Sequence, residues 1–157
     1  MKLMISKMAW LCLLTTFATA ALAEPTVGFS ASRIKAGVGE TITIQIVMSD
    51  FPTTEGGGLT LRFNPSVVRV VDVEIDSATW NFVTRDGVID NDKGRVKDLL
   101  FSSFSGVAGD AVVATVTLET LGRGRSRLKL VESGLNPFGS GGNSLDVALI
   151  KSVVSVR

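Results

Sequence analysis

The only dense group of carboxylates in the sequence is formed by Asp86, Asp90 and Asp92. A paired-carboxylate glycosidase needs two such groups facing each other across a cleft. Asp90 and Asp92 instead lie within one tight turn, where carboxylates more often cap their own backbone. The chain has no histidine, no tyrosine and a single cysteine, Cys12, so the usual general bases, thiol nucleophiles and zinc ligands are nearly absent. We therefore expect a protein that is not an enzyme.

The same acidic turn offers clustered hard oxygens that suit calcium. Residues 90–94 read Asp-Asn-Asp-Lys-Gly. An EF-hand loop requires glycine at its sixth position and a bidentate glutamate at its twelfth. Counted from Asp90, glycine comes fifth and the twelfth residue is Phe101. A plain hairpin turn is therefore the favoured interpretation, and we expect neither a metal nor a cofactor.

Trp80 is the candidate for stacking on a sugar, because carbohydrate-binding sandwiches use exposed planar aromatic side chains. Trp80 and Phe82 share a phase with Ala78, which predicts that all three side chains point into the core. A sugar platform built on Trp80 stays open as the alternative.

The N-terminus reads as a targeting segment. Lys2 and Lys7 precede a charge-free run over residues 8–20, and Ala-Leu-Ala ends at Ala23. This pattern is typical of a signal peptide cleaved near Ala23, which predicts a protein that is secreted or periplasmic, with no membrane span. Residues 24–157 are then enough for one domain with one core.

The charge balance of residues 24–157 is close to neutral. Without Lys2 and Lys7 the sixteen basic residues become fourteen, against fifteen acidic ones, for a net charge of −1. Neither nucleic acid nor an anionic membrane is therefore expected as the main partner.

Short β patterns broken by Gly, Asn, Asp and Pro fill the chain after the targeting segment, and no apolar pattern has a helical period. The nine expected strands lie near residues 26–32, 40–48, 57–63, 67–75, 79–85, 95–101, 111–120, 126–131 and 147–156. Their regular spacing predicts an all-β, nine-stranded β-sandwich. The glycine-rich stretch 133–144 is expected to be a flexible surface loop that either contacts a partner or is a tolerated insertion.

Four segments, in this order, resemble the cohesin family. Residues 58–75 hold an alternating strand, an Asn-Pro turn and a valine-rich strand. Residues 88–101 contain an acidic turn that ends in glycine and leads into an aliphatic-Lys strand. Residues 110–118 are similar to the Ala-Thr-aliphatic-Thr strand of the family, and residues 145–156 to its closing strands. Each motif is common by itself, but their order and spacing cover nearly all of residues 24–157.

The resemblance implies a jelly-roll sandwich that binds dockerin modules without catalysis, through the sheet formed by its third, fifth, sixth and eighth strands. Carried over to this sequence, the outward side chains of three of those strands are Thr60, Arg62, Lys97, Leu99, Arg127 and Lys129. That face is basic with an apolar spot, whereas cohesin faces are expected to be richer in acidic and amide groups. The chain also contains no recognisable dockerin or anchor, which argues against a scaffold role.

These observations lead to one main hypothesis and two alternatives. The main one is an exported, cohesin-like binding module for a dockerin-like or envelope protein, with a possible link to extracellular polysaccharide degradation. One alternative is a carbohydrate-binding module of related fold that binds polysaccharide. The other is a structural subunit of an envelope or secretion assembly, held by an edge strand.

Overall fold

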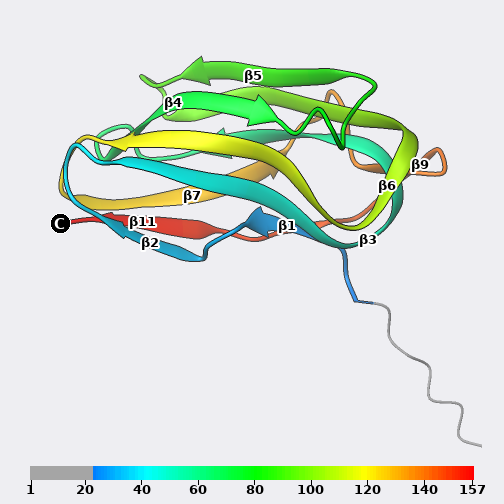
Figure 1. Cartoon of the computed structure of the whole chain (residues 1–157), viewed down its shortest axis with the longest axis horizontal. Coiled ribbons are helices and arrows are strands. Elements are labelled where there is room, and N and C mark those ends of the chain that lie inside the picture. Colours follow the sequence, from blue (N-terminus) through cyan, green and yellow to red (C-terminus); the bar gives the residue numbers. More distant parts are fainter. Residues whose placement is uncertain (1–22) are drawn as a thin grey trace, which may run out of the picture.

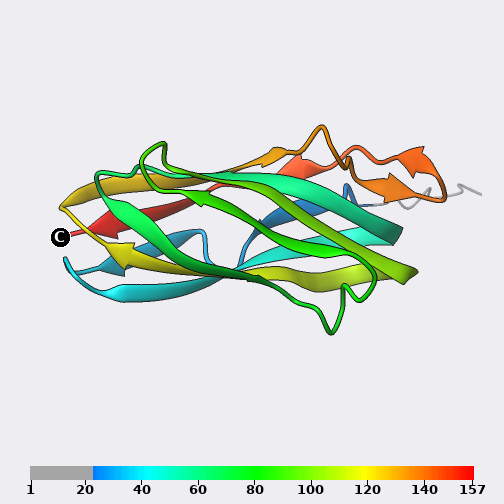
Figure 2. The same cartoon turned by 90° about the horizontal axis from the view of Figure 1, so that it is seen from above.

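The structure is a computed structural model that describes residues 23–157, so the expected signal segment lies outside the described residues except for Ala23. The described residues form a two-layer β-sandwich (Figures 1 and 2), which confirms the all-β prediction. Its strands are β1 (Thr26–Phe29), β2 (Arg33–Ala36), β3 (Thr41–Arg62), β4 (Val68–Ile75), β5 (Thr84–Asp90), β6 (Arg95–Thr120), β7 (Gly124–Glu132), β8 (Gly139–Ser140), β9 (Asn143–Ser144), β10 (Ala148–Leu149) and β11 (Ser152–Val156). Within residues 23–157 there is no helix long and apolar enough to cross a bilayer.

Two long strands, β3 and β6, pass through both layers and pair with each other along their length. β3 replaces the expected strands 40–48 and 57–63, and β6 replaces the expected strands 95–101 and 111–120. The residues between these pairs read as breaks because they contain Gly, Pro and Asp, but they stay paired through bulges, as at Phe51 with Gly109 and Thr54 with Val107. The bulges bend both strands so that each crosses from one sheet to the other.

The front sheet runs in the order β2, β11, β7, β3, β6 and β5, using the second half of β3 and the first half of β6. The back sheet runs β10, β1, β3, β6 and β4, using the other halves. The expected closing strand 147–156 is split, because β10 joins the back sheet and β11 joins the front sheet. The expected first strand 26–32 likewise ends at Phe29, and the chain then enters the front sheet as β2.

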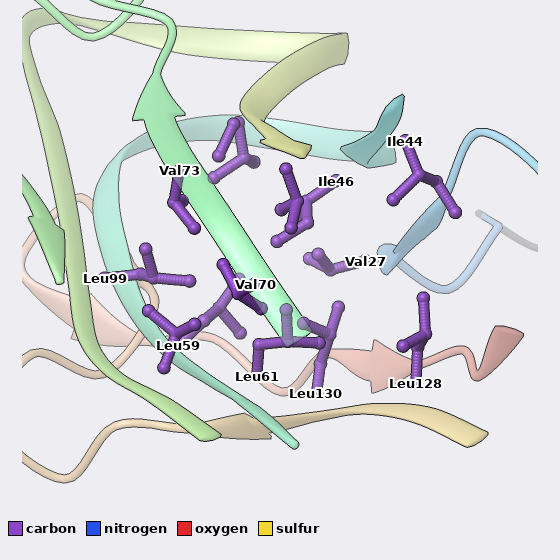
Figure 3. Close-up of a cluster of buried hydrophobic side chains, with 14 of the residues drawn as sticks. Val27, Ile44, Ile46, Leu59, Leu61, Val70, Val73, Leu99, Leu128 and Leu130 are labelled. Atoms are coloured by element: carbon purple, nitrogen blue, oxygen red, sulfur yellow. The ribbon is translucent and has the colours of Figure 1, made fainter. Parts of the chain in front are cut away.

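Alternate side chains of both sheets meet in one hydrophobic core. Ile44 and Ile46 of β3 point inward from the back sheet, and Leu128 and Leu130 of β7 from the front sheet (Figure 3). Their polar neighbours in the chain face outward, as the burial pattern of β7 shows. Each sheet therefore keeps one outer face free of the core.

Trp80 belongs to this core, so the core interpretation is confirmed and the sugar platform on Trp80 is wrong. Its side chain is fully buried, its Nε1 donates a 2.9 Å hydrogen bond to the carbonyl of Val112, and its ring lies 4.7 Å from that of Phe101. Phe82 and Ala78, expected to point inward with it, are exposed. The expected strand 79–85 does not form there: a turn precedes Trp80, and β5 begins only at Thr84.

The stretch 133–144 is not the strandless surface loop that its glycine content predicts, because it contains two short strands and a buried aromatic residue. Phe138 is fully buried and its ring lies 5.7 Å from Phe51 and 5.9 Å from Phe101. The short strands β8 and β9 pair with each other, and β8 also pairs with β3 at Gly56. The sequence pattern hides this because a single aromatic residue, rather than a period, anchors the loop.

Candidate partner-binding face

Strand β7 contributes several basic side chains to the outer face of the front sheet. Arg125, Arg127 and Lys129 are exposed, whereas Ser126 and Leu128 between them are buried. This alternation follows from the period of two in a strand, which places successive basic side chains about 6.8 Å apart on one face. β7 therefore carries a row of positively charged side chains along the outer face of the sheet.

The same basic character continues across the neighbouring strands. Arg62 of β3 lies directly opposite Lys129 on one side and Arg95 of β6 on the other. Thr60, two residues before Arg62, is half-buried opposite Val131. The structure therefore gathers Thr60, Arg62 and Lys129 on one surface.

Lys97 and Leu99 differ, although the sequence pattern places both on the outer face. Lys97 is exposed, but Leu99 is fully buried and lies in the core with Leu59 (Figure 3). The reason is a β-bulge. Leu59 pairs with Leu99 and Leu61 pairs with Val96, so β6 advances by three residues where β3 advances by two. Leu99 is therefore withdrawn from the candidate face.

The bulge is held by one residue of unusual backbone conformation. Asp98 has a φ of 57°, in the left-handed region where Asp is more tolerated than most residues. The extra residue shifts the phase of β6, so that the side chain after it turns inward. Leu100 rather than Leu99 then occupies the half-exposed position opposite Gly58.

A shallow hollow of about 440 Å³ lies on this part of the face. Its basic lining residues are Arg62, Arg95 and Lys97. The apolar Val131 and Leu135, the polar Thr60 and two carboxylates also line it. Leu135 is 73% exposed. The hollow therefore offers an apolar spot within a positively charged rim.

Arg95 and Leu135 are among the lining residues that are absent from the face expected from the sequence. Arg95 shares its outward phase with Lys97, which the pattern of β6 could have shown. Leu135 could not have been found, because it reaches the face through a turn that is anchored by Asn136, whose side chain donates a 2.9 Å bond to the carbonyl of Gly57.

Most of the basic groups on this face form no ion pair within the described residues. The ion pairs among the described residues are Arg69 with Glu119 on the back sheet, and Lys93 and Arg95 with Asp90. Within residues 23–157, no carboxylate lies within 4.0 Å of the charged groups of Arg62, Lys97, Arg127 and Lys129. These cations remain free to meet an external anion.

The Asp90 turn is a hairpin turn, as the sequence favoured. Asp90 Oδ1 accepts a 3.1 Å hydrogen bond from the backbone of Lys93, and its Oδ2 lies 3.3 Å from Arg95 Nε. Asn91 binds both backbone groups of Val70 on β4, at 2.8 and 2.9 Å. The side-chain oxygens of Asp90 and Asn91 thus serve the turn and its attachment to β4. Within residues 23–157, no group of three Asp, Glu, His or Cys side chains is arranged to hold a metal.

Comparison with protein-family models and with curated proteins gives no match. Solved structures do match. A non-cellulosomal cohesin from Archaeoglobus fulgidus aligns with a TM-score of 0.71 at 21% identity, covering 86% of this chain and 92% of that chain. The chain has a cohesin-like fold.

Other cohesin structures agree. The cohesin–dockerin complex Coh-OlpA–Doc918 from Clostridium thermocellum gives a TM-score of 0.67 at 14% identity, covering 86% of this chain and all of that one. The cohesin CaCohA2 from Clostridium acetobutylicum gives 0.62 at 14% identity, covering 84% and 91%. The cohesin-like domain therefore spans nearly all the described residues, and the neighbours' chains are covered almost in full.

Proposed function

We propose that residues 24–157 are an exported, non-catalytic binding module that recognises a polypeptide partner through the outer face of the front sheet. The proposal includes removal of residues 1–23 on export and a partner of the dockerin or envelope class, with a role in extracellular polysaccharide degradation.

One observation carries this proposal: the centre of the front sheet presents unpaired cations around an apolar spot. Arg62 and Lys97 line the hollow that contains Val131 and Leu135, and Lys129 lies directly opposite Arg62. A mix of apolar centre and charged rim is the usual anatomy of a protein interface. The cohesin structures similar to this chain include complexes with dockerins, which supports a polypeptide as the occupant.

The polar chemistry of the face fits binding better than catalysis. A hydrolase would need a pair of carboxylates or a base aimed at a reacting atom. The two carboxylates of the hollow are Asp98, which lies in the bulge, and Glu132, whose Oε1 accepts a 3.0 Å bond from the backbone of Phe138. The positions of both carboxylates are therefore accounted for by the bulge and by the loop that follows β7.

The test is capture of the partner by purified residues 24–157 from secreted and envelope fractions of the source organism, with and without calcium. The double variant Arg62→Glu with Lys129→Glu is expected to abolish capture, because it reverses the charge at the centre of the face. Its melting temperature should stay nearly unchanged, since Arg62 and Lys129 are exposed.

The control for this test places the same number of glutamates on the other sheet. Thr43 and Gln45 are exposed on the back sheet, so Thr43→Glu with Gln45→Glu should capture the partner as well as the unaltered protein does. Undiminished capture by the front-sheet variant would show that the partner binds elsewhere.

A further inference from the structure

A second hollow lies at the far edge of the front sheet, away from the one described above. It measures about 300 Å³ and is formed by β2, β11 and β7. Its lining combines four basic residues with two aliphatic ones and a serine, and the basic residues are Arg33, Lys35, Arg125 and Arg157. None of these positions belongs to the face expected from the sequence.

Strand register explains why these charges converge. Ser155 of β11 lies between Lys35 of β2 and Arg125 of β7. Neighbouring strands are about 4.8 Å apart, so the two basic residues stand on either side of a small side chain. The backbone of Arg157 continues the ladder by donating a 3.1 Å bond to the carbonyl of Ala36, which keeps Arg157 beside them.

The cluster has no anion of its own among the described residues. The charged groups of Arg33, Lys35, Arg125 and Arg157 have no carboxylate within 4.0 Å in residues 23–157. Like charges gathered around one hollow repel each other, even though β11 separates Lys35 from Arg125. An external anion would relieve that repulsion, so the arrangement is complementary to a negatively charged ligand.

Protection of an open sheet edge explains only part of this cluster. β2 ends the strand order of the front sheet, and basic side chains on an edge strand hinder unwanted pairing. Arg33 and Lys35 fit that role. Arg125 fits it less well, because it lies on β7, which pairs with β11 at Arg125 and with β3 from Lys129 to Glu132 and is therefore not the edge strand.

We propose that this edge hollow is a carboxylate-binding site that takes an acidic segment of the polypeptide partner, an inference that rests on the proposed function. The basic residues of β7 recur at every second position, about 6.8 Å apart, which is also the repeat of acidic residues at alternate positions of an extended peptide. The hollow contains no aromatic side chain on which a sugar ring could stack. Both features favour a polypeptide over a polysaccharide.

The probe that tests this site is a synthetic peptide of alternating glutamate and serine, with the glutamine–serine peptide as its uncharged match. Residues 24–157 should bind the first and not the second. Binding should weaken as salt shortens the screening length from about 30 Å at 0.01 M to about 8 Å at 0.15 M.

The variant Lys35→Gln with Arg125→Gln should weaken binding of the acidic peptide about tenfold, the sum expected for two exposed charge pairs. The matched control is Thr43→Glu with Gln45→Glu, which changes the net charge by the same amount on the back sheet and should bind within about twofold of the unaltered protein. Equal weakening in both variants would mean general charge attraction and would overturn the site. Lack of peptide binding, or binding of a uronic-acid polysaccharide in its place, would also overturn it.

Failure of this site and failure of the proposed function give different results. If Arg62→Glu with Lys129→Glu abolishes partner capture while Lys35→Gln with Arg125→Gln leaves capture unchanged, the edge site is wrong and the proposed function stands. If the acidic peptide binds at the edge but no polypeptide is captured, the proposed function is wrong, and with it the assigned occupant.

Discussion

Trp80 shows at the residue scale how burial decides between two roles. Because its ring is fully buried against Phe101 and its Nε1 is satisfied by Val112, Trp80→Ala should lower the free energy of unfolding by about 3–5 kcal/mol. Denaturant unfolding measures this loss. Trp80→Phe, which keeps most of the ring but not the hydrogen bond, should lose less. Unchanged stability together with lost polysaccharide binding would instead place Trp80 on the surface.

Asp98 is the second residue whose conformation has a measurable cost. With its φ of 57°, a β-branched replacement such as Asp98→Val should lower stability by about 1–2 kcal/mol. Asp98→Gly removes the conformational strain and should stay close to the unaltered protein. Equal unfolding midpoints for the two variants would show that the bulge does not depend on this backbone conformation.

Single residues also mark the limit of what the sequence could predict about the site. Period-two alternation places Arg62, Arg127 and Lys129 outward correctly, because each strand is regular around them. It fails at Leu99, because nothing in the apolar pattern of β6 shows that Asp98 adds a residue to the strand. One bulge therefore changes the apolar component of the face while leaving its cations in place.

At the scale of elements, the turn and short strands after β7 act as part of the core. Phe138→Ala should lower the free energy of unfolding by about 3–5 kcal/mol, since its ring is buried between Phe51 and Phe101. Leu135→Ala, in the same loop but exposed, is the control and should change stability little. Equal effects in denaturant unfolding would contradict the anchoring role of Phe138.

The elements divide clearly into those that the sequence predicts and those that it does not. β4 and β7 are flanked by turn residues, and β7 alternates cleanly, so the expected strands 67–75 and 126–131 match them closely. The continuity of β3 and β6 is hidden, because Gly and Pro within a strand normally mark its end. The pairing of β2 with β11 is also hidden, since it joins residues far apart in the sequence.

At the scale of the whole molecule, charge is unevenly distributed although its sum is small. The basic residues concentrate on the front sheet, whereas the outer face of the back sheet carries Asp72, Glu74 and Glu119 together with Arg69, which pairs with Glu119. A cation exchanger should therefore retain residues 24–157 near neutral pH despite a net charge of −1.

Charge placement, rather than net charge, should set the elution. Lys35→Gln with Arg125→Gln should elute at clearly lower salt, whereas Thr43→Glu with Gln45→Glu, of the same net charge, should elute near the unaltered protein. Identical shifts for both variants would show that the front sheet is not the adsorbing surface.

The pairing of β2 with β11 brings the beginning and the end of the domain together. Val153 to Val156 align in parallel with Arg33 to Ala36, so the front sheet cannot close until the last few residues are available. A ribosome or a translocation pore delivers residues in order, and β2 must therefore wait, unpaired, for almost the whole chain to follow. Contacts between such distant residues slow folding because a large loop has to close first. Until that step, the cations at the edge of the front sheet keep the waiting strand soluble and discourage it from pairing with another chain.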